Sequence, residues 1–149
     1  MTNLSEHFTL DEFTRSEYAE RKCLNNSIPN NLMANAKRMA ELMEQVRNIL
    51  GKPIIVNSMY RSPAVNKAVG GASTSMHLKA LACDFICPQF GTPYEVAERL
   101  QKEGGFTITY DQLIYEGTWV HIGLKEGNKK PRLQALTMRK GAYLNGIVK

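Results

Sequence analysis

The chain has 149 residues, of which 43% are hydrophobic and 22% are charged. These proportions are those of a globular domain and exclude a disordered or fibrous chain. The formal net charge of +5 favours polyanionic surroundings such as nucleic acid, an anionic membrane face or an acidic cell wall, without choosing among them.

The first half of the chain predicts two helices separated by a loop. The spacing of Thr9 and Glu12 is that of a capping box, so a short helix should begin there. Residues 19–30 are rich in Asn and predict a loop. Residues 31–50 carry apolar side chains at steps of three and four, which indicates a long helix with its methionines in the core, ended by Gly51.

The middle of the chain predicts a strand, a short helix and a polar loop. Residues 53–59 have the composition of a strand. Ser62 followed by Pro63 is typical of a helix start, and that helix should reach Val69 before two glycines. A polar loop over residues 72–75 then leads to His77.

Four further strands and one helix are predicted after that loop. The strands are expected at 80–86, 112–116, 119–124 and near 133–138, with a tight hairpin at Gly117-Thr118, and the helix should run from a capping box at Thr92 to about Lys102. We expect one α+β domain over 1–149, with a core at about 8–124, a basic C-terminal extension at 125–149 and a mainly antiparallel sheet packed against helices.

The three cysteines, Cys23, Cys83 and Cys87, are an odd number and cannot form a complete disulfide framework. We interpret Cys83 and Cys87 as buried apolar thiols. This usage fits a protein that folds in a reducing cytoplasm. The N-terminus shows no basic region before an apolar stretch, so we expect no signal peptide and no transmembrane segment.

Two histidines and one aspartate lie in contexts that suggest chemistry. Side chains alternate along a strand, so Asp84 should share a face with small alanines while larger apolar residues point to the core. By the same alternation, His121 lies away from the aliphatic face and next to Gly123. Two imidazoles and a carboxylate on roomy faces suit a three-ligand zinc site whose fourth position would hold an ionisable water. Hydrogen-bonded structural groups are the competing interpretation.

The sequence around these residues resembles that of the M15 family of zinc peptidases, which includes D-Ala-D-Ala carboxypeptidases and phage endolysins. The matching segments are 60–63, 66–71, 75–84 and 119–122, within a resemblance over about 8–124 that is nearest to the small phage and prophage branch. The family pattern is Ser-x-His-x-x-Gly-x-Ala-x-Asp, followed later by Trp-x-His. Its usual glycine is Ala80 here, which would matter if that position requires a positive φ angle.

The resemblance implies a hedgehog/DD-peptidase-like fold with a zinc site on the sheet, where His77, Asp84 and His121 bind Zn²⁺. It also implies that Arg61 holds the substrate carbonyl oxygen or its developing negative charge and that Ser75 lines the substrate pocket. A cation aimed at a developing oxyanion is a large catalytic contribution, although Arg61 could instead brace a loop or form a surface ion pair.

The general base needs separate reasoning, because many relatives place an acid three residues before the final histidine and Thr118 stands there. If Gly117-Thr118 form a two-residue turn, Glu116 pairs with Trp119 and shares a face with His121, at a diagonal separation that a glutamate can span. Asp111 is the runner-up, and an exposed turn glutamate is the structural alternative to a catalytic Glu116.

We therefore predict a zinc-dependent peptidase that hydrolyses peptide bonds of bacterial peptidoglycan, as a carboxypeptidase or an endopeptidase, and acts as a phage or prophage lytic enzyme. It would be made in the bacterial cytoplasm and would act on the wall after release or as a virion component, as a monomer whose partner is the stem peptide. The basic tail could hold it near anionic wall polymers or phospholipid. A non-catalytic, zinc-containing wall-binding or phage structural module is the alternative, and the sequence shows no motif for nucleic-acid binding.

Overall fold

The structure is a computed structural model that describes residues 2–149. One six-stranded sheet organises it, with strands in the order β1-β2-β4-β3-β5-β6. The strands are β1 (Ile55–Ser58), β2 (Ala82–Ile86), β3 (Gln112–Tyr115), β4 (Val120–Gly123), β5 (Gln134–Arg139) and β6 (Ala142–Asn145). Every neighbouring pair is antiparallel except β3 and β5, which are parallel. The predicted α+β class with a mainly antiparallel sheet is thus confirmed.

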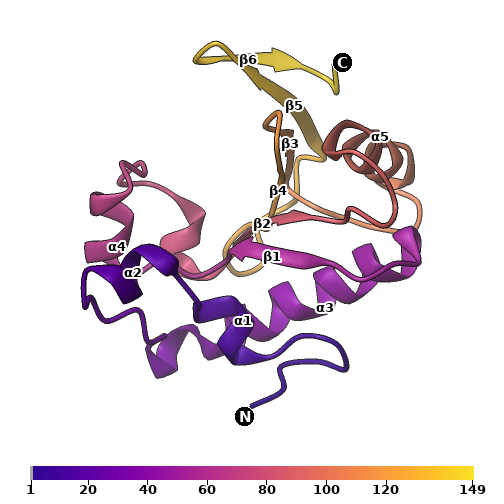
Figure 1. Ribbon diagram of the computed structural model, residues 1–149. Coiled ribbons are helices and arrows are strands. Elements are labelled where there is room, and N and C mark those ends of the chain that lie inside the picture. Colours follow the sequence, from indigo (N-terminus) through magenta and orange to yellow (C-terminus); the bar gives the residue numbers. More distant parts are fainter. Residues whose placement is uncertain (1) are drawn as a thin grey trace.

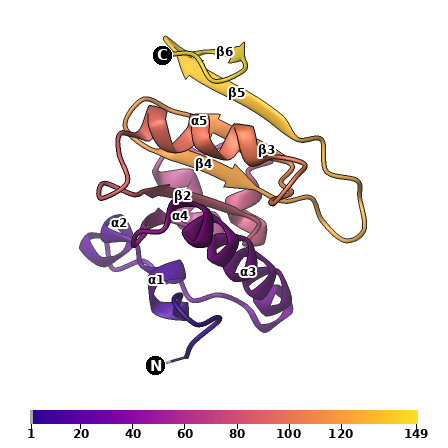
Figure 2. The same cartoon turned by 90° about the vertical axis from the view of Figure 1, so that its right-hand side faces the viewer.

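Five α-helices and two 3₁₀ helices surround the sheet in the described residues. They are α1 (Leu10–Thr14), α2 (Glu17–Arg21), η1 (Asn30–Leu32), α3 (Met33–Leu50), α4 (Pro63–Ala68), η2 (Met76–Lys79) and α5 (Pro93–Glu103). Figures 1 and 2 show α3 and α5 together on one face of the sheet, with α4 on the opposite side. The core lies between these two helices and the sheet, and Met39 and Met43 are fully buried in it, as the helical stripe predicts.

Local sequence signals place most helix ends. Thr9 and Glu12 form the predicted capping box at α1, and Thr92 forms the second one at α5. Ser62 caps α4 ahead of Pro63, and Gly51 ends α3 in the left-handed conformation that glycine adopts without strain. These caps satisfy backbone groups that a helix leaves unpaired at its ends.

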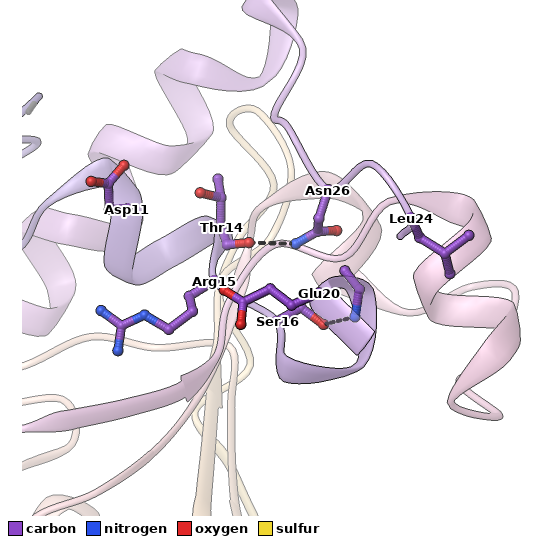
Figure 3. Close-up of a pocket in the computed structure, with 8 residues that line it drawn as sticks. Asp11, Thr14, Arg15, Ser16, Glu20, Leu24 and Asn26 are labelled. Atoms are coloured by element: carbon purple, nitrogen blue, oxygen red, sulfur yellow. Dashed lines mark hydrogen bonds between the residues drawn. The ribbon is translucent and has the colours of Figure 1, made fainter. Parts of the chain in front are cut away.

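The prediction of a loop over residues 19–30 is wrong at its start, because α2 extends to Arg21. The Ser16 hydroxyl caps this helix by accepting a hydrogen bond from the Ala19 amide. The next segment is held by Asn26, whose side-chain amide donates to the Thr14 carbonyl (Figure 3). The same amide also donates to the Tyr60 carbonyl. A buried side chain thus fixes the chain between α2 and η1.

The C-terminal region contains two strands where the sequence predicted one. β5 lies where a strand was expected near 133–138, and β6 returns beside it through a turn at Lys140-Gly141, where both residues have positive φ. β6 was missed because its four residues are all exposed, so burial gives it no alternating pattern.

His77 lies in η2, a turn that the sequence did not predict, and the following strand begins at Ala82 and not at residue 80. The reason for the delay is Ala80, which ends η2 in the left-handed conformation with φ 57°. Its amide donates to the His77 and Met76 carbonyls. The turn therefore sets His77 apart from the strand that carries Asp84.

Cys83 and Cys87 are buried free thiols, as predicted, and Cys23 is exposed. Burial raises the pKa of the Cys83 thiol well above its usual value. Within residues 2–149, no helix combines the length and the apolar character needed to cross a lipid bilayer.

Candidate metal centre

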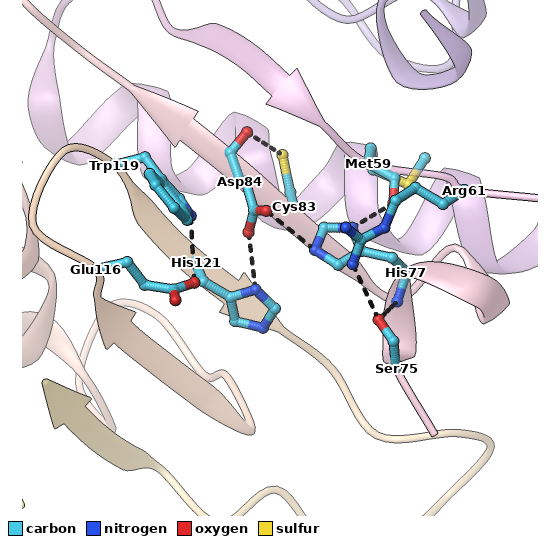
Figure 4. A network of polar contacts seen from close by, with 9 residues as sticks. All are labelled: Met59, Arg61, Ser75, His77, Cys83, Asp84, Glu116, Trp119 and His121. Carbon is cyan, nitrogen blue, oxygen red and sulfur yellow. Dashed lines mark hydrogen bonds and ion pairs between the residues drawn. The ribbon is translucent and has the colours of Figure 1, made fainter. Parts of the chain in front are cut away.

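The fold brings His77, Asp84 and His121 together, with one potential ligand atom of each lying within 4.8 Å of the others. Asp84 in β2 and His121 in β4 are directly opposite each other in the antiparallel ladder. Directly opposite side chains are close neighbours on one sheet face. His77 approaches the same point from η2 (Figure 4). Strand alternation correctly predicted the faces of Asp84 and His121.

Hydrogen bonding fixes which nitrogen of His77 faces the cluster. Its Nδ1 lies 2.7 Å from the Met59 carbonyl oxygen. A carbonyl only accepts, so Nδ1 carries a proton and Nε2 is the nitrogen that is turned toward the cluster. Such a bond orients the imidazole ligands of metals in proteins. The side chain is almost fully buried, at 2% exposure, which keeps the ring in this orientation.

The cluster has the chemistry of a cation site. His77 Nε2 lies 3.3 Å from Asp84 Oδ2, and His121 Nδ1 lies 2.8 Å from Asp84 Oδ1. Two imidazoles and a carboxylate are ligands that zinc accepts, so the residues present fit the metal.

The Asp84 carboxyl is strongly biased to its charged form. Burial opposes its ionisation, but hydrogen bonds with His121 and His77 outweigh burial and hold its pKa well below the usual range. Gly123 allows a close approach of the chain beside this cluster, because a Cβ there would lie only 3.2 Å from the Leu81 carbonyl oxygen and 3.7 Å from His121 Nε2.

Arg61 and Ser75 border the metal cluster, and they are joined to each other. The Arg61 Nη2 donates to the Ser75 hydroxyl at 3.2 Å, and the same hydroxyl accepts from the His77 amide. The Arg61 amide donates to the His77 carbonyl, so its backbone also braces η2. Among residues 2–149, the Arg61 side chain forms no ion pair, and its buried Nε has no hydrogen-bond partner. This cation is available to an anionic group of a ligand.

Glu116 lies where the hairpin argument predicted. Its amide donates to the Trp119 carbonyl across the turn at Gly117-Thr118, and its carboxylate accepts from Trp119 Nε1 at 3.2 Å. Burial and the charge of Asp84 raise the Glu116 pKa, against the opposing effect of His121. Figure 4 shows its carboxylate on the same side as the His121 ring.

Asp111, the runner-up for the general base, is held elsewhere. Its carboxylate accepts three hydrogen bonds from Arg132, one from the backbone amide and two from the guanidinium, at 2.8–3.0 Å. These bonds satisfy a buried acid, and the residue does not line the cleft around the metal cluster.

A cleft of about 490 Å³ surrounds the cluster and includes Arg61, Ser75 and Glu116. The residues that line it and that sequence reasoning did not assign to the site include Gln112, Ile114 and Tyr143. Gln112 and Ile114 could have been found, because strand alternation puts them on the face of Glu116. Tyr143 could not, since its place depends on β6.

A sequence model of the family Peptidase M15 matches residues 6–123. The chain belongs to the peptidase M15 family. M15 proteins are zinc peptidases, and membership indicates a metallopeptidase directed at peptidoglycan-type substrates. The matched residues include all three candidate ligands and Glu116, while β5 and β6 lie beyond them. The comparison with curated proteins gives no match.

Ala80 departs from the M15 pattern at a position that requires positive φ. An L-residue in this conformation costs about 1 kcal/mol or more relative to glycine. The cost is offset because the Ala80 methyl is fully buried in the core. The turn keeps its shape, and His77 keeps its place.

Proposed function

We propose that this protein is a zinc-dependent peptidase that hydrolyses peptide bonds in bacterial peptidoglycan, as a carboxypeptidase or an endopeptidase of a phage or prophage lytic system. The observation that supports it best is the convergence of one potential ligand atom each from His77, Asp84 and His121 within 4.8 Å, at the wall of a cleft that also contains Glu116 and Arg61. The M15 membership gives this cluster its chemical context.

In this proposal His77, Asp84 and His121 would hold the metal, which would supply a Lewis acid and lower the pKa of water. Glu116 accepts a proton from the attacking water and donates it to the leaving amine. The raised pKa of Glu116 suits this exchange, because a base that must also act as an acid should titrate nearer to neutral pH.

Arg61 would stabilise the negative charge that develops on the carbonyl oxygen. It is half-buried, and within residues 2–149 the one hydrogen bond of its side chain is to the Ser75 hydroxyl. A cation held in place before the reaction needs little reorganisation when charge develops. Ser75 keeps the guanidinium at the cleft wall and at the same time caps η2.

The test is digestion of purified peptidoglycan by the wild-type protein, with and without a chelator, and mass spectrometry of the products. We expect new peptide termini that disappear with the chelator and return when zinc is added. The fragment masses identify the bond. Zinc bound at one equivalent with no cleavage of any wall type would overturn the enzymatic proposal in favour of a non-catalytic wall-binding or phage structural module.

The basic C-terminal region could hold the enzyme near anionic wall polymers, a hypothesis that rests on charge alone. Lys129 and Lys130 are exposed and suit a test by neutralisation, whereas Arg132 is unsuitable because it binds the buried Asp111. The double change K129Q/K130Q should slow lysis of whole cells and leave cleavage of a soluble peptide unchanged. Equal losses in both assays would refute the hypothesis.

A further inference from the structure

A second groove, of about 600 Å³, lies beside β1 and opens next to the metal cleft. Its walls include all four residues of β1, residues 15–18 and Arg21 at α2, and Val65 of α4 together with Val69 just after that helix. Arg61 and Val69 line both this groove and the metal cleft. A ligand chain in the groove can therefore continue past Arg61 to the metal cluster. We call it the β1 groove.

The outer edge of β1 offers main-chain groups to a ligand. β1 is an end strand of the sheet, and among the strands of the described residues it pairs with β2 alone. An edge strand presents a row of N–H and C=O groups that can pair with another extended chain. Ile55 is 50% exposed at this edge, a high value for a large apolar side chain. Addition of a strand would cover it and satisfy the edge.

The charges around the β1 groove favour an acidic ligand. Arg15, Arg21 and Arg61 line it against a single acid, Glu17. Within residues 2–149, none of these three arginines forms an ion pair, while several other basic residues do. In Figure 3 the Arg15 guanidinium extends away from Asn26 and makes no drawn contact. Three free cations beside one sheet edge match a chain that carries carboxylates.

We propose that the β1 groove binds an extended acidic peptide, which pairs its main chain with β1 and places carboxylates against Arg15 and Arg21. This rests on the proposed function, because the ligand would be the part of the stem peptide that lies away from the bond to be cut. Arg61 stands where the peptide passes from the groove into the metal cleft. Binding there would align the peptide before cleavage.

The test is an NMR titration of zinc-loaded protein carrying Glu116→Gln, so that the peptide stays intact. The probe is a synthetic stem tetrapeptide with free carboxylates, and a second titration uses the same peptide with its carboxylates amidated. We expect the largest amide shifts at residues 55–58 and about tenfold weaker binding of the amidated peptide.

The double variant R15Q/R21Q in the same background should also bind the acidic peptide about tenfold more weakly. A matched control is K37Q/K102Q, which removes two exposed charges on α3 and α5, away from both cavities, and should leave the affinity unchanged. Heteronuclear spectra of each variant without peptide show whether the fold is retained.

The proposal that the β1 groove binds an acidic peptide would be overturned by amide shifts confined to the metal cleft or by equal affinity for the acidic and the amidated peptide. It would also be overturned if the amides of β1 shifted with protein concentration in the absence of peptide, because this would indicate that a second copy of the chain binds there. The proposed function fails independently. If wild-type protein cleaves no wall but the peptide shifts residues 55–58, the groove stands and the peptidase assignment does not.

Discussion

The two ends of β3 carry two acids with opposite fates. Asp111 precedes the strand and Glu116 follows it. The hydrogen bonds of Arg132 outweigh burial at Asp111 and hold its pKa below the usual value, whereas burial and the charge of Asp84 raise the pKa of Glu116. One acid is saturated by a cation and a backbone amide, and the other faces an open cleft with one indole N–H.

This contrast shows that burial alone does not mark a functional acid. Both side chains are withdrawn from water, so an exposure criterion would select either. What separates them is the remaining capacity to exchange a proton: three hydrogen bonds fix the charge of Asp111, while the Glu116 carboxylate accepts one hydrogen bond from the side chains of residues 2–149. The following predictions test this separation.

The largest expected effect is on catalysis. Glu116→Gln should lower kcat about 10²–10⁴-fold, because the amide keeps the size and the Trp119 contact but cannot accept the proton. Zinc content, measured by elemental analysis, should stay at that of the wild type. The matched change Asp111→Asn should keep kcat per folded molecule within about threefold, and a collapse of kcat in that variant would reverse the assignment of the two acids.

The second effect is on stability, where we expect the substitution of Asp111 to have the larger effect and that of Glu116 the smaller one. Asp111→Ala should lower the free energy of unfolding by about 2–3 kcal/mol, since it leaves the Arg132 guanidinium and its backbone amide without their acceptor. Glu116→Gln should change it by less than about 0.5 kcal/mol. Urea unfolding followed by circular dichroism gives both values, and equal losses would contradict a purely structural role for Asp111.

A smaller effect should appear on acidification. Because the folded-state pKa of Asp111 is depressed, its ionised form contributes stability above the unfolded pKa of about 3.9, and this contribution is lost as pH falls through the folded pKa. The difference in unfolding free energy between wild type and Asp111→Asn should therefore be constant from pH 5 to 8 and should shrink below about pH 4. If this difference in unfolding free energy grew on acidification, the depressed pKa of Asp111 in the folded state would be contradicted.

The smallest effect concerns the wall that faces Glu116. Tyr143 in β6 is 59% exposed and lines the metal cleft. Tyr143→Ala should raise KM about fivefold with little change in kcat, because the lost ring contact holds the substrate without touching the reacting atoms. Leu144→Ala, on the other face of the same strand, serves as the control. A loss confined to kcat would place Tyr143 in the chemistry instead.

The local part of the site could be predicted from the sequence. Alternation along the two strands placed Asp84 and His121 on roomy faces, and the two-residue turn placed Glu116 on the face of His121. Each of these inferences needs only the period of a strand and the length of a hairpin. The capping residues likewise fixed the starts of α1, α4 and α5 because they act within one turn of helix.

The non-local part could not be predicted. That β2 lies beside β4, and that η2 folds back so that His77 contacts the Met59 carbonyl, depends on pairings between distant segments. The role of Arg132 was missed for the same reason, since a basic residue in a basic tail gives no sign of a buried partner 21 residues earlier. The exposed strand β6 gave no hydrophobic pattern at all.

The β5–β6 hairpin, which joins the sheet through the parallel pairing of β5 with β3, could vary in evolution separately from the candidate metal site. The candidate ligands and Glu116 lie within residues 6–123, whereas the hairpin that supplies Tyr143 lies after them. That hairpin is docked at its root by Arg132 on Asp111 and by the Gln134 amide, which donates to the Asp111 carbonyl. Asp111 thus anchors the start of the hairpin. Natural or engineered hairpins of different length and sequence, anchored in the same way, could change substrate specificity without altering the candidate metal ligands or Glu116.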